Sequence, residues 1–390
     1  MNILQVIPYF AFKRGGDVNV CYNLSKQLTS MGHNVTILTT TFEYNKEDTD
    51  LVDNLTMVPI DYEFNLALFI YSPKMKKWLD KNITKYDIIH LHELRSYQNN
   101  IVIKYAKKYN IPYVLQPHNS TPKHVTKTLI KHIYDIFYGN NIIQNATTTI
   151  AVSKEEAQYD KQMKAHDVRV IYNGMNTKDY ENLPEDGTYK DKHIHSPYIL
   201  YFGRLDKLKG IENIIKAFSL LPERYDEYKL VIAGKSTPYK ERLEKIIETR
   251  NIEEKVIFTG FIKEEDKISI YHDADVFVNP VEYMGGVAIT VFESILAGTP
   301  VVVTKESGEL IDIMNAGITV EYGNINQLKY AIIETIENKP LAKKHVLNGQ
   351  AYIHKNLKWT SVANKILKVY EDALIKNKED YYDKNTVNMP

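Results

Sequence analysis

The sequence predicts an α/β fold built from two doubly wound halves. Short β-branched segments alternate with segments whose apolar residues recur every three to four positions, and a polar segment at 173–197 interrupts this alternation once before it restarts. Strands that alternate with helices through short connections form parallel sheets covered on both faces. A chain of 390 residues has room for two such domains, and two similar halves around one linker place the expected cleft between them.

The first half opens with a short apolar strand, which Pro8 ends. From Val18, apolar residues recur on one helical face, and Gly32 closes that helix before the next β-branched run. The same alternation continues through this half. It predicts strands at 3–7, 35–38, 87–91, 113–116, 148–152 and 168–171, and helices at 18–31, 101–109 and 125–138.

The second half repeats the pattern after a linker rich in turn-forming pairs. It predicts strands at 198–202, 229–233, 256–259, 276–279 and 301–304, and helices at 211–221, 239–250, 268–272 and 291–296. A last helical pattern at 361–376 follows the second sheet and is free to reach back to the first domain. The predicted organisation is therefore a domain at 1–174, a linker at 175–197, a domain at 198–358, a returning helix at 359–378 and a flexible tail at 379–390.

Composition excludes several classes of protein. The 49 basic and 49 acidic residues balance, so no global charge calls for a nucleic-acid partner. The single cysteine, Cys21, cannot form an internal disulfide or a paired-cysteine metal site, which favours the cytoplasm. No apolar stretch reaches the ~18 residues of a membrane-spanning helix, and the first strand is too short for a signal peptide.

Two loops place glycines between a strand and a helix, where backbone amides approach ligands closely and the helix N-terminus favours an anion. The first contains Gly15 and Gly16, for which an ordinary turn is the alternative. The second runs from Gly203 to Gly210 and carries Arg204 and Lys209, which suit a diphosphate; a solvated basic loop is the alternative. Neither half contains the G-x-G-x-x-G fingerprint of a dehydrogenase.

With these residues the chain resembles glycosyltransferase family 4. In the second half the resemblance rests on "YFGRLDKLKGIENIIKAF", "VIAG", "VIFTGFI", "ADVFVNP", "VFESILAGTPVV" and "VEYGN". In the first half it rests on "LTSMGHNVTILTT", "YDIIHLHE", "TTTIAVSKEE" and "VIYNGMN". The resemblance covers about residues 1 to 375. It implies a GT-B fold, in which two Rossmann-like domains face each other across a cleft, the first binding the acceptor and the second the nucleotide-sugar donor.

The resemblance also implies roles for individual residues. Arg204 and Lys209 would hold the donor diphosphate, and Glu293 would accept hydrogen bonds from the ribose hydroxyls. His118 would face the donor sugar and the acceptor, with helix capping or simple solvation as the alternative. Further substrate contacts are expected from the glycine loops, from the walls of the base site and from the amides before the Glu293 helix: Gly15, Gly16, Gly203, Phe261, Ile262, Gly286, Val287, Ala288, Ile289 and Thr290.

One position departs from the family pattern. The family usually has two glutamates with seven residues between them, and eight residues before Glu293 this chain has Gly285. Glu282 is the nearest carboxylate and could bind the sugar if the loop is lengthened. The departure keeps open a protein that binds a nucleotide sugar without transferring it, and an epimerase or phosphorylase of the same fold.

No metal or other cofactor is expected. His90 and His92 alternate on one strand beside Glu93, but no third ligand stands at a useful spacing, so structural or cleft-lining roles are favoured. The D-x-D triplets at 48–50 and 273–275 lie in a polar loop and before a buried strand, which does not suit a metal–diphosphate site. Lysine and arginine can neutralise a departing diphosphate without a metal.

The expected function is metal-independent, retaining transfer of a hexose from a UDP- or GDP-sugar to a glycan or lipid-linked acceptor in envelope or glycan biosynthesis. Residues 1–175 carry a net charge of +4, which leaves −4 for the rest of the chain. Lys127 and Lys131 of the predicted helix 125–138, with Lys123 just before it, follow a four-residue spacing. The other face of this helix is apolar and carries Val125, Leu129, Ile133 and Phe137. Packing of that apolar face in the core is favoured, and peripheral contact with an anionic membrane is the alternative.

Overall fold

A computed structural model of the chain describes residues 1–14, 16–48, 53–121, 128–282 and 288–386. By their internal contacts the residues form two compact units, the first made of Met1–Gly174 with Trp359–Pro390 and the second of Met175–Lys358. The segment 175–197, expected as a linker, thus belongs to the second unit. Asp273 holds it there, because its carboxylate accepts backbone N–H bonds from Gly187, Tyr189 and Lys190 at 2.6–2.9 Å.

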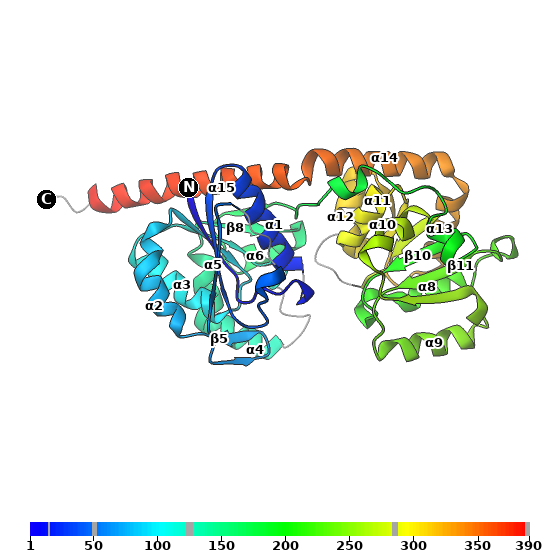
Figure 1. Cartoon of the computed structure of the whole chain (residues 1–390), viewed down its shortest axis with the longest axis horizontal. Coiled ribbons are helices and arrows are strands. Elements are labelled where there is room, and N and C mark those ends of the chain that lie inside the picture. Colours follow the sequence, from blue (N-terminus) through cyan, green and yellow to red (C-terminus); the bar gives the residue numbers. More distant parts are fainter. Residues whose placement is uncertain (15, 49–52, 122–127, 283–287, 387–390) are drawn as a thin grey trace. The chain divides into compact units, whose positions relative to one another are not determined.

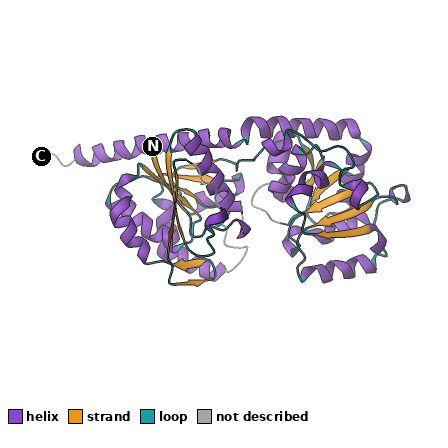
Figure 2. Cartoon of the chain, viewed as in Figure 1, coloured by secondary structure: helices purple, strands orange, loops and turns teal. Residues whose placement is uncertain are grey.

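The first unit is built on a seven-stranded sheet in which all paired strands are parallel (Figures 1 and 2). The strand order is β3-β2-β1-β6-β7-β8-β9, so the winding direction reverses between β1 and β6. Ligands of open α/β sheets bind at the carboxyl ends of the strands beside such a reversal. The strands are β1 (Asn2–Val6), β2 (Asn34–Thr40), β3 (Leu55–Ile60), β6 (Ile88–His92), β7 (Tyr113–Gln116), β8 (Thr148–Ala151) and β9 (Val168–Val170).

Alternating side chains bury both faces of this sheet. Ile3 and Ile88 contribute to a core shared with α1 (Gly16–Ser30) and α15 (Trp359–Thr386), whereas their neighbours Leu4 and Ile89 face the core on the other side. That second core contains residues of α2 (Lys74–Asn82), α3 (Tyr97–Lys108) and α5 (Asn140–Gln144). The unit also contains the hairpin β4 (Phe64–Leu66) and β5 (Phe69–Tyr71), the helix α4 (Thr128–Tyr134), a π-helical segment (Asp135–Gly139) and α6 (Lys154–Gln162).

The second unit has a six-stranded parallel sheet with the order β12-β11-β10-β13-β14-β15, and its winding reverses between β10 and β13. Its strands are β10 (Tyr198–Phe202), β11 (Lys229–Ala233), β12 (Val256–Gly260), β13 (Val276–Asn279), β14 (Val301–Thr304) and β15 (Gly317–Val320). Its helices are α7 (Lys190–His193), α8 (Ile211–Phe218), α9 (Tyr239–Thr249), α10 (Glu264–His272), α11 (Ile289–Leu296), α12 (Lys305–Met314), α13 (Ile325–Glu337) and α14 (Lys339–Asn356).

The doubly wound, two-domain α/β fold predicted from the sequence is confirmed. Five strands, β7, β10, β11, β13 and β14, occupy the predicted residues. The prediction missed β3, the β4–β5 hairpin, β15 and the helices α2, α5, α6, α7, α12, α13 and α14. The last helix is also longer than predicted, because α15 continues to Thr386 through residues expected to be a flexible tail.

The expected packing of helix 125–138 is wrong. Leu129, Ile133 and Phe137 were expected to face the core, and all three are exposed. The buried side of this helix is polar instead: Asp135 pairs with Arg95, and the hydroxyl of Tyr134 donates to the carbonyl oxygen of Ser96. Residues 123, 125 and 127, which completed the predicted pattern, lie outside the described residues.

Candidate functional site

The loop from Gly203 to Gly210 follows β10 at the reversal point of the second sheet and leads into the N-terminus of α8. Its turn is closed locally, because the Asp206 carboxylate accepts the N–H of Leu208 at 3.0 Å. The side chain of Arg204 is 72% exposed, with its guanidinium 3.7 Å from Asp206. Burial and the neighbouring Arg204 lower the pKa of Lys209, and Asp206 opposes them. Two cations thus lie close together beside a helix N-terminus, an arrangement that favours a polyanion.

The loops on the two sides of this reversal point touch through their backbones. The N–H of Glu282 donates to the carbonyl oxygen of Leu208 at 2.9 Å. Gly210 has φ +65°, and a Cβ there would overlap the carbonyl oxygen of Pro280. Only glycine combines this backbone conformation with such a close approach. The structure therefore places Glu282 next to the turn that carries Lys209, with its carboxylate 3.5 Å from the hydroxyl of Tyr322.

Glu293 lies buried on α11 and is held by two side chains of α10. Lys267 Nζ lies 2.7 Å from one carboxylate oxygen, and the hydroxyl of Tyr271 donates to the other at 3.0 Å. Burial pulls the pKa of Lys267 down, but Glu293 outweighs it and the net shift is upward. A carboxylate has about four lone-pair positions, so Glu293 keeps accepting capacity for a ligand. The ring of Tyr271 also stacks on Phe202, which precedes Gly203, at 5.2 Å between centroids.

The sequence did not single out Lys267 or Tyr271. Both stand on α10 at i and i+4, so they share one helical face, but that spacing does not indicate that a glutamate on another helix is their partner.

Phe261, a predicted wall of the base site, is 77% exposed after β12, and its neighbour Ile262 is buried. Ala288, Ile289 and Thr290, which were predicted as amide donors, lie at the N-terminus of α11. Gly15, Gly286 and Val287, and the departing Gly285, lie outside the described residues.

Two predicted glycines have little steric constraint. Gly16 begins α1, and a Cβ there would meet nothing within 4 Å. A Cβ at Gly203 would approach only the hydroxyl end of Tyr201, at 3.0 Å. Within this loop, glycine is therefore strictly required at Gly210. A second strict requirement lies outside the loop, at Gly234 after β11, where a Cβ would overlap the carbonyl oxygen of Gly203.

His118 is half-buried at the carboxyl end of β7 in the first unit, and it begins a hydrogen-bonded chain that continues through buried side chains. Its Nε2 is 2.7 Å from Nδ1 of His92, whose Nε2 is 2.7 Å from Oε1 of Gln5. The amide nitrogen of Gln5 donates to the hydroxyl of Tyr370 on α15 at 3.2 Å, and that hydroxyl lies 2.7 Å from Nδ1 of His90. His90 and His92, expected to have structural or cleft-lining roles, are both fully buried with stacked rings.

The acceptor at Gln5 sets the direction of the whole chain. Because Oε1 of Gln5 can only accept, Nε2 of His92 carries the proton and its Nδ1 is an acceptor. His118 must therefore donate from Nε2, which leaves Nδ1 as its unprotonated nitrogen. Burial lowers the pKa of His118 to about 4, against the opposing effect of Asp17. At neutral pH this histidine is an uncharged imidazole in one tautomer.

Backbone strain and carboxyl groups gather around His118. Glu93, His118 and Asn119 all have φ between +55° and +65°, a region that non-glycine residues rarely adopt and that is concentrated at functional sites. Burial, Asp17 and Glu156 raise the pKa of Glu93 well above its usual range, although Arg95 opposes them. Glu156 supports the strained loop, since its carboxylate accepts the N–H groups of Asn119 and Val152.

Within the described ranges, no group of three or more histidine, cysteine, aspartate and glutamate side chains is arranged to ligate a metal ion. Measured by length and hydropathy, every helix in the described part of the chain falls short of a bilayer-spanning segment.

Comparisons with known proteins agree with this architecture. Over 379 residues the chain is 28% identical to an uncharacterized glycosyltransferase of Methanocaldococcus jannaschii, covering 92% of this chain and 95% of the relative. It is 24% identical to the phosphatidyl-myo-inositol mannosyltransferase of Mycolicibacterium smegmatis, covering 95% of this chain and 94% of that protein.

Solved structures match the fold over almost the whole length. Sucrose-phosphate synthase from Thermosynechococcus elongatus superposes with a TM-score of 0.76 at 20% identity, covering 96% of this chain and 99% of the other. Anabaena HepE in complex with UDP superposes with a TM-score of 0.78 at 19% identity, covering 95% of this chain and all of the other. Both are GT-B structures, and at these identities they show the fold alone.

Two family models match consecutive parts of the chain. The model described as Glycosyltransferase Family 4 matches residues 14–179, and the model described as Glycosyl transferases group 1 matches residues 188–352. Together they account for most of both units, and the chain belongs to this family of GT-B glycosyltransferases.

Proposed function

We propose that the protein is a retaining, metal-independent glycosyltransferase that moves a hexose from a nucleotide diphosphate sugar to a glycan or lipid-linked acceptor at the cytoplasmic side of a membrane. The observation that carries the proposal is the pair Arg204 and Lys209 at the reversal point of the second sheet. Breaking the bond between sugar and phosphate leaves negative charge on the diphosphate, and fixed cations stabilise that charge as it develops.

We assign roles to the other residues from their positions. Glu293 would accept the ribose hydroxyls while Lys267 and Tyr271 hold its carboxylate in place. Glu282 lies beside the cationic turn and would bind the sugar hydroxyls. His118 would offer an uncharged imidazole to the sugar or the acceptor. In a retaining transfer the acceptor attacks on the face that the leaving group departs from, and the diphosphate oxygen can take the acceptor's proton.

The comparisons support the substrate classes in this proposal. HepE was solved in complex with UDP and with UDP-glucose, which makes a uridine diphosphate sugar the first donor to test. The mannosyltransferases at 24% identity are named for transfer to phosphatidyl-myo-inositol, which favours a lipid-linked acceptor. A GDP-sugar is the second donor to test.

The test is the double variant Arg204→Ala/Lys209→Ala, with Lys207→Ala as the matched control. Lys207 is an exposed lysine in the same turn, so its loss removes one charge without touching the proposed diphosphate site. The double variant is expected to lose at least 100-fold in transfer rate and to lose thermal stabilisation by UDP and GDP, while the control keeps both. Full activity of the double variant would contradict the diphosphate assignment.

The same assays distinguish the alternatives. A binding protein without transfer would be stabilised by the nucleotide sugar but would release no product with any acceptor. An epimerase would convert the nucleotide sugar with no acceptor present.

A further inference from the structure

The helical segment from α4 through the π segment exposes an apolar stripe. Five of its exposed residues stand at i, i+1, i+4, i+7 and i+8, which lie on one side of a helix, and a sixth stands at i+9 in the π-helical part. Leu129 and Phe137 are 72% and 70% exposed. A helix that packs on a domain normally turns such a face inward, so this one has the opposite orientation. The exposed residues of this stripe are Leu129, Ile130, Ile133, Ile136, Phe137 and Tyr138.

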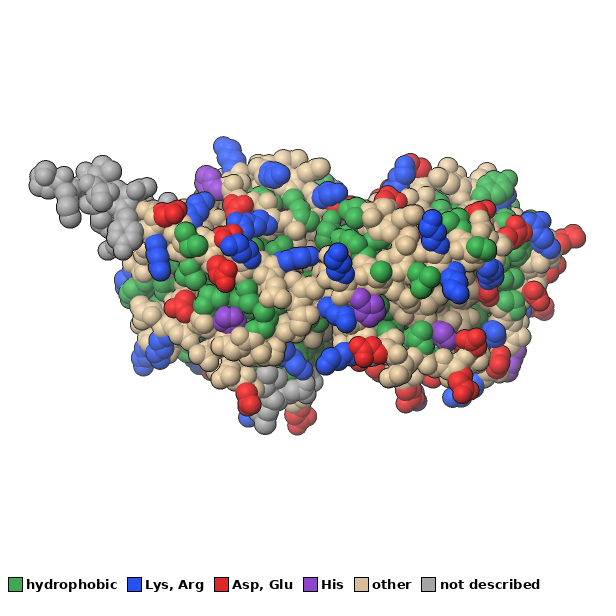
Figure 3. All heavy atoms as spheres, turned by 90° about the horizontal axis from the view of Figure 1, so that it is seen from above, with side chains coloured by type: hydrophobic (Ala, Val, Ile, Leu, Met, Phe, Trp, Pro, Cys, Tyr) green, Lys and Arg blue, Asp and Glu red, His purple; other side chains and the backbone are tan. Residues whose placement is uncertain are grey.

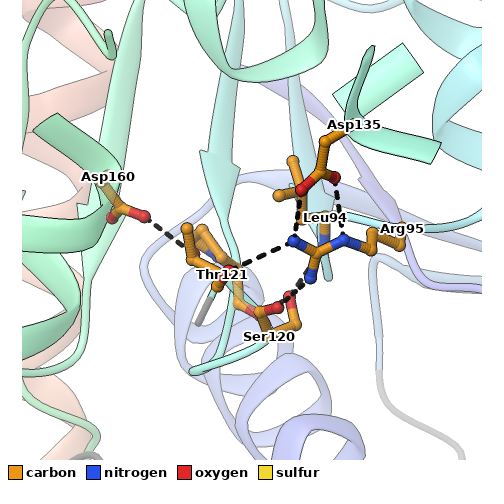
Figure 4. Close-up of polar contacts among 7 residues, drawn as sticks. Leu94, Arg95, Ser120, Thr121, Asp135 and Asp160 are labelled. Carbon is orange, nitrogen blue, oxygen red and sulfur yellow. Dashed lines mark hydrogen bonds and ion pairs between the residues drawn. The ribbon is translucent and has the colours of Figure 1, made fainter. Parts of the chain in front are cut away.

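Polar contacts fix that orientation (Figure 4). The guanidinium of Arg95 makes two hydrogen bonds to the buried carboxylate of Asp135, at 2.7 and 2.8 Å. A Cβ at Gly139 would overlap the Asp135 carboxylate, so glycine makes room for it one turn later. Because a buried, paired charge cannot turn outward without leaving its partner unpaired, the opposite, apolar face must point away from the unit.

The β4–β5 hairpin extends this apolar surface. Phe69 of β5 contacts Tyr134 of α4 edge to face, with ring centroids 6.4 Å apart. The hairpin exposes Phe64, Leu66 and Leu68, and Leu66 is 76% exposed. Together the stripe and the hairpin hold nine of the twenty large apolar side chains that are exposed among the described residues. Single exposed apolar residues are ordinary, but a concentration on adjacent elements marks an interaction surface.

The charge of the residues near this apolar surface indicates which kind of partner binds there. Residues 101–150 contain six lysines and one acidic residue, Asp135, which is already paired with Arg95. Of these lysines, Lys107 lies beside the end of the segment, with its Nζ 3.0 Å from the side-chain oxygen of Asn141 on α5. By contrast, basic and acidic side chains are interspersed over the face that Figure 3 shows, which carries α15.

We propose that the stripe 129–138 and the hairpin tip 64–68 insert into the interfacial region of an anionic phospholipid bilayer. Exposed apolar side chains beside a lysine-rich segment are the composition of interfacial membrane anchors. Of the two acidic residues that precede the hairpin tip, Asp61 and Glu63, the first is paired with Lys74. A second copy of the chain fits less well, because a symmetric dimer would place the same lysine-rich segment against itself.

The surface is also connected to the candidate site. Besides Asp135, the guanidinium of Arg95 donates to the carbonyl oxygens of Ser120 and Thr121, which follow His118 on the same loop. The hydroxyl of Thr121 in turn donates to Asp160 at 2.8 Å. One side chain thus joins the membrane face to the loop that carries His118. The inference rests on the proposed function in one respect only, namely that the bilayer supplies the acceptor.

The test is co-sedimentation of the full chain with vesicles, without donor or acceptor. We expect binding to vesicles of phosphatidylcholine with about one-third phosphatidylglycerol, and weaker binding to pure phosphatidylcholine. The variant Leu66→Ser/Leu129→Ser/Phe137→Ser should reduce partitioning into the anionic vesicles at least tenfold, because it removes three highly exposed apolar side chains. The matched control is Tyr330→Ser/Leu347→Ser/Ile375→Ser, which changes three exposed apolar residues on other elements and should bind normally.

Equal partitioning of the two triple variants would overturn the proposal, as would absence of binding by the unmodified chain. A change in oligomeric state in the first triple variant, with vesicle binding intact, would assign the surface to a second copy instead. Stabilisation of each variant by UDP reports on the donor site alone, so failure of the donor assignment is distinguishable from failure of membrane docking.

Discussion

Gln5 and Tyr370 do not touch His118, and they act on its tautomer through His92, which does. Three hydrogen bonds run in one direction from His118 through His92 and Gln5 to Tyr370. Such chains polarise each bond in turn, and inside a protein each bond is stronger than it would be in water. Gln5 is the residue that sets the direction, because its Oε1 accepts from His92 while its amide nitrogen donates to Tyr370.

We expect Gln5→Leu to disturb His118 more than Tyr370→Phe does. The first change removes the acceptor that fixes His92, whereas the second leaves the bond between His92 and Gln5 in place. Proton–nitrogen correlation spectra of histidine-labelled protein should show the Nε2–H tautomer of His118 in the native chain and in Tyr370→Phe, and a mixture in Gln5→Leu. If native His118 carries its proton on Nδ1, the direction of the chain is wrong.

Gly210 is the glycine on which the cationic loop depends most. Alanine there must adopt φ +65° and must also displace the carbonyl of Pro280. Gly323 in the same unit has φ +76° with nothing within 4 Å of a Cβ, so it measures the cost of the backbone conformation alone. We expect Gly323→Ala to cost about 1 kcal/mol and Gly210→Ala about 1–3 kcal/mol more, as measured from denaturant unfolding of this unit. Equal losses in the free energy of unfolding for the two variants would mean that the loop 203–210 can move away from Pro280 at no cost.

The sequence could predict only part of the candidate site at this scale. Arg204, Lys209, Glu282 and His118 carry signals in the sequence, through loop position or family resemblance. Gln5 and Tyr370 carry none, because a single sequence does not show that residues 365 positions apart form a hydrogen bond. The partners of Glu293 were missed for the same reason.

At the scale of elements, α6 begins with a capping motif that also supports the loop of His118. The hydroxyl of Ser153 accepts the N–H of Glu156, and the Glu156 side chain reaches back to the N–H of Val152. Burial and the neighbouring Asp160 raise the pKa of Glu156 to about 8, although the N–H groups of Val152 and Asn119 oppose them. Burial also raises the pKa of Asp160 to about 7. Both carboxyl groups are therefore protonated in the folded unit at mildly acidic pH.

The raised pKa of Glu156 makes stability depend on pH. Between about pH 4.5 and 8 the native state holds a proton that the unfolded state has released, so the free energy of unfolding falls as pH rises, by about 1.4 kcal/mol per pH unit for each such proton. We expect Glu156→Gln to reduce this slope by about one proton between pH 5 and 7, in denaturant unfolding of the first unit. The neighbouring Glu155→Gln is the control. An unchanged slope in Glu156→Gln would show that Glu156 is ionised in the native state.

The described part of the predicted helix 125–138, which is residues 128–138, shows what periodicity leaves open. Leu129, Ile133 and Phe137 are all exposed, because periodicity predicts a shared apolar face but does not say whether that face is buried. Arg95, which lies outside this helix, determines which face is buried, because it pairs with Asp135 on the polar face. By contrast, β10 and β13 lie at the predicted residues because continuous apolar runs between turn residues have only one compatible placement, in the centre of a covered parallel sheet.

At the scale of the whole molecule, strand–helix alternation was enough to predict the fold class. The prediction stopped short in residues 305–358, where α12, α13 and α14 surround a single strand and the alternation becomes irregular. The sequence alone did not determine that the last helix packs on the first unit. It showed only that this helix follows a completed sheet.

That last helix is part of the core of the first unit. α15 buries Val362, Ala363, Ile366, Leu367, Val369, Tyr370 and Ala373 against α1 and the sheet. At about 1.5–3 kcal/mol for each large side chain, this burial is comparable to the whole net stability of a domain, about 5–15 kcal/mol. Gly174 is packed against the ring of Trp359, where a Cβ would overlap the indole, so the helix is fixed at its first residue.

We therefore expect a chain that ends at Lys358 to lose the cooperative unfolding of its first unit, while a chain that ends at Lys378 keeps it. The buried residues of α15 all precede Lys378, and the side chain of Asn377, which donates to the carbonyl oxygen of Asn110 at 3.0 Å, is retained as well. Limited proteolysis with mass spectrometry checks this directly: the chain ending at Lys358 should be cleaved throughout 1–174 and resist cleavage in 175–358. Resistance of residues 1–174 in that shorter chain would mean that the first unit folds without its returning helix, and that Tyr370 only completes the His118 chain.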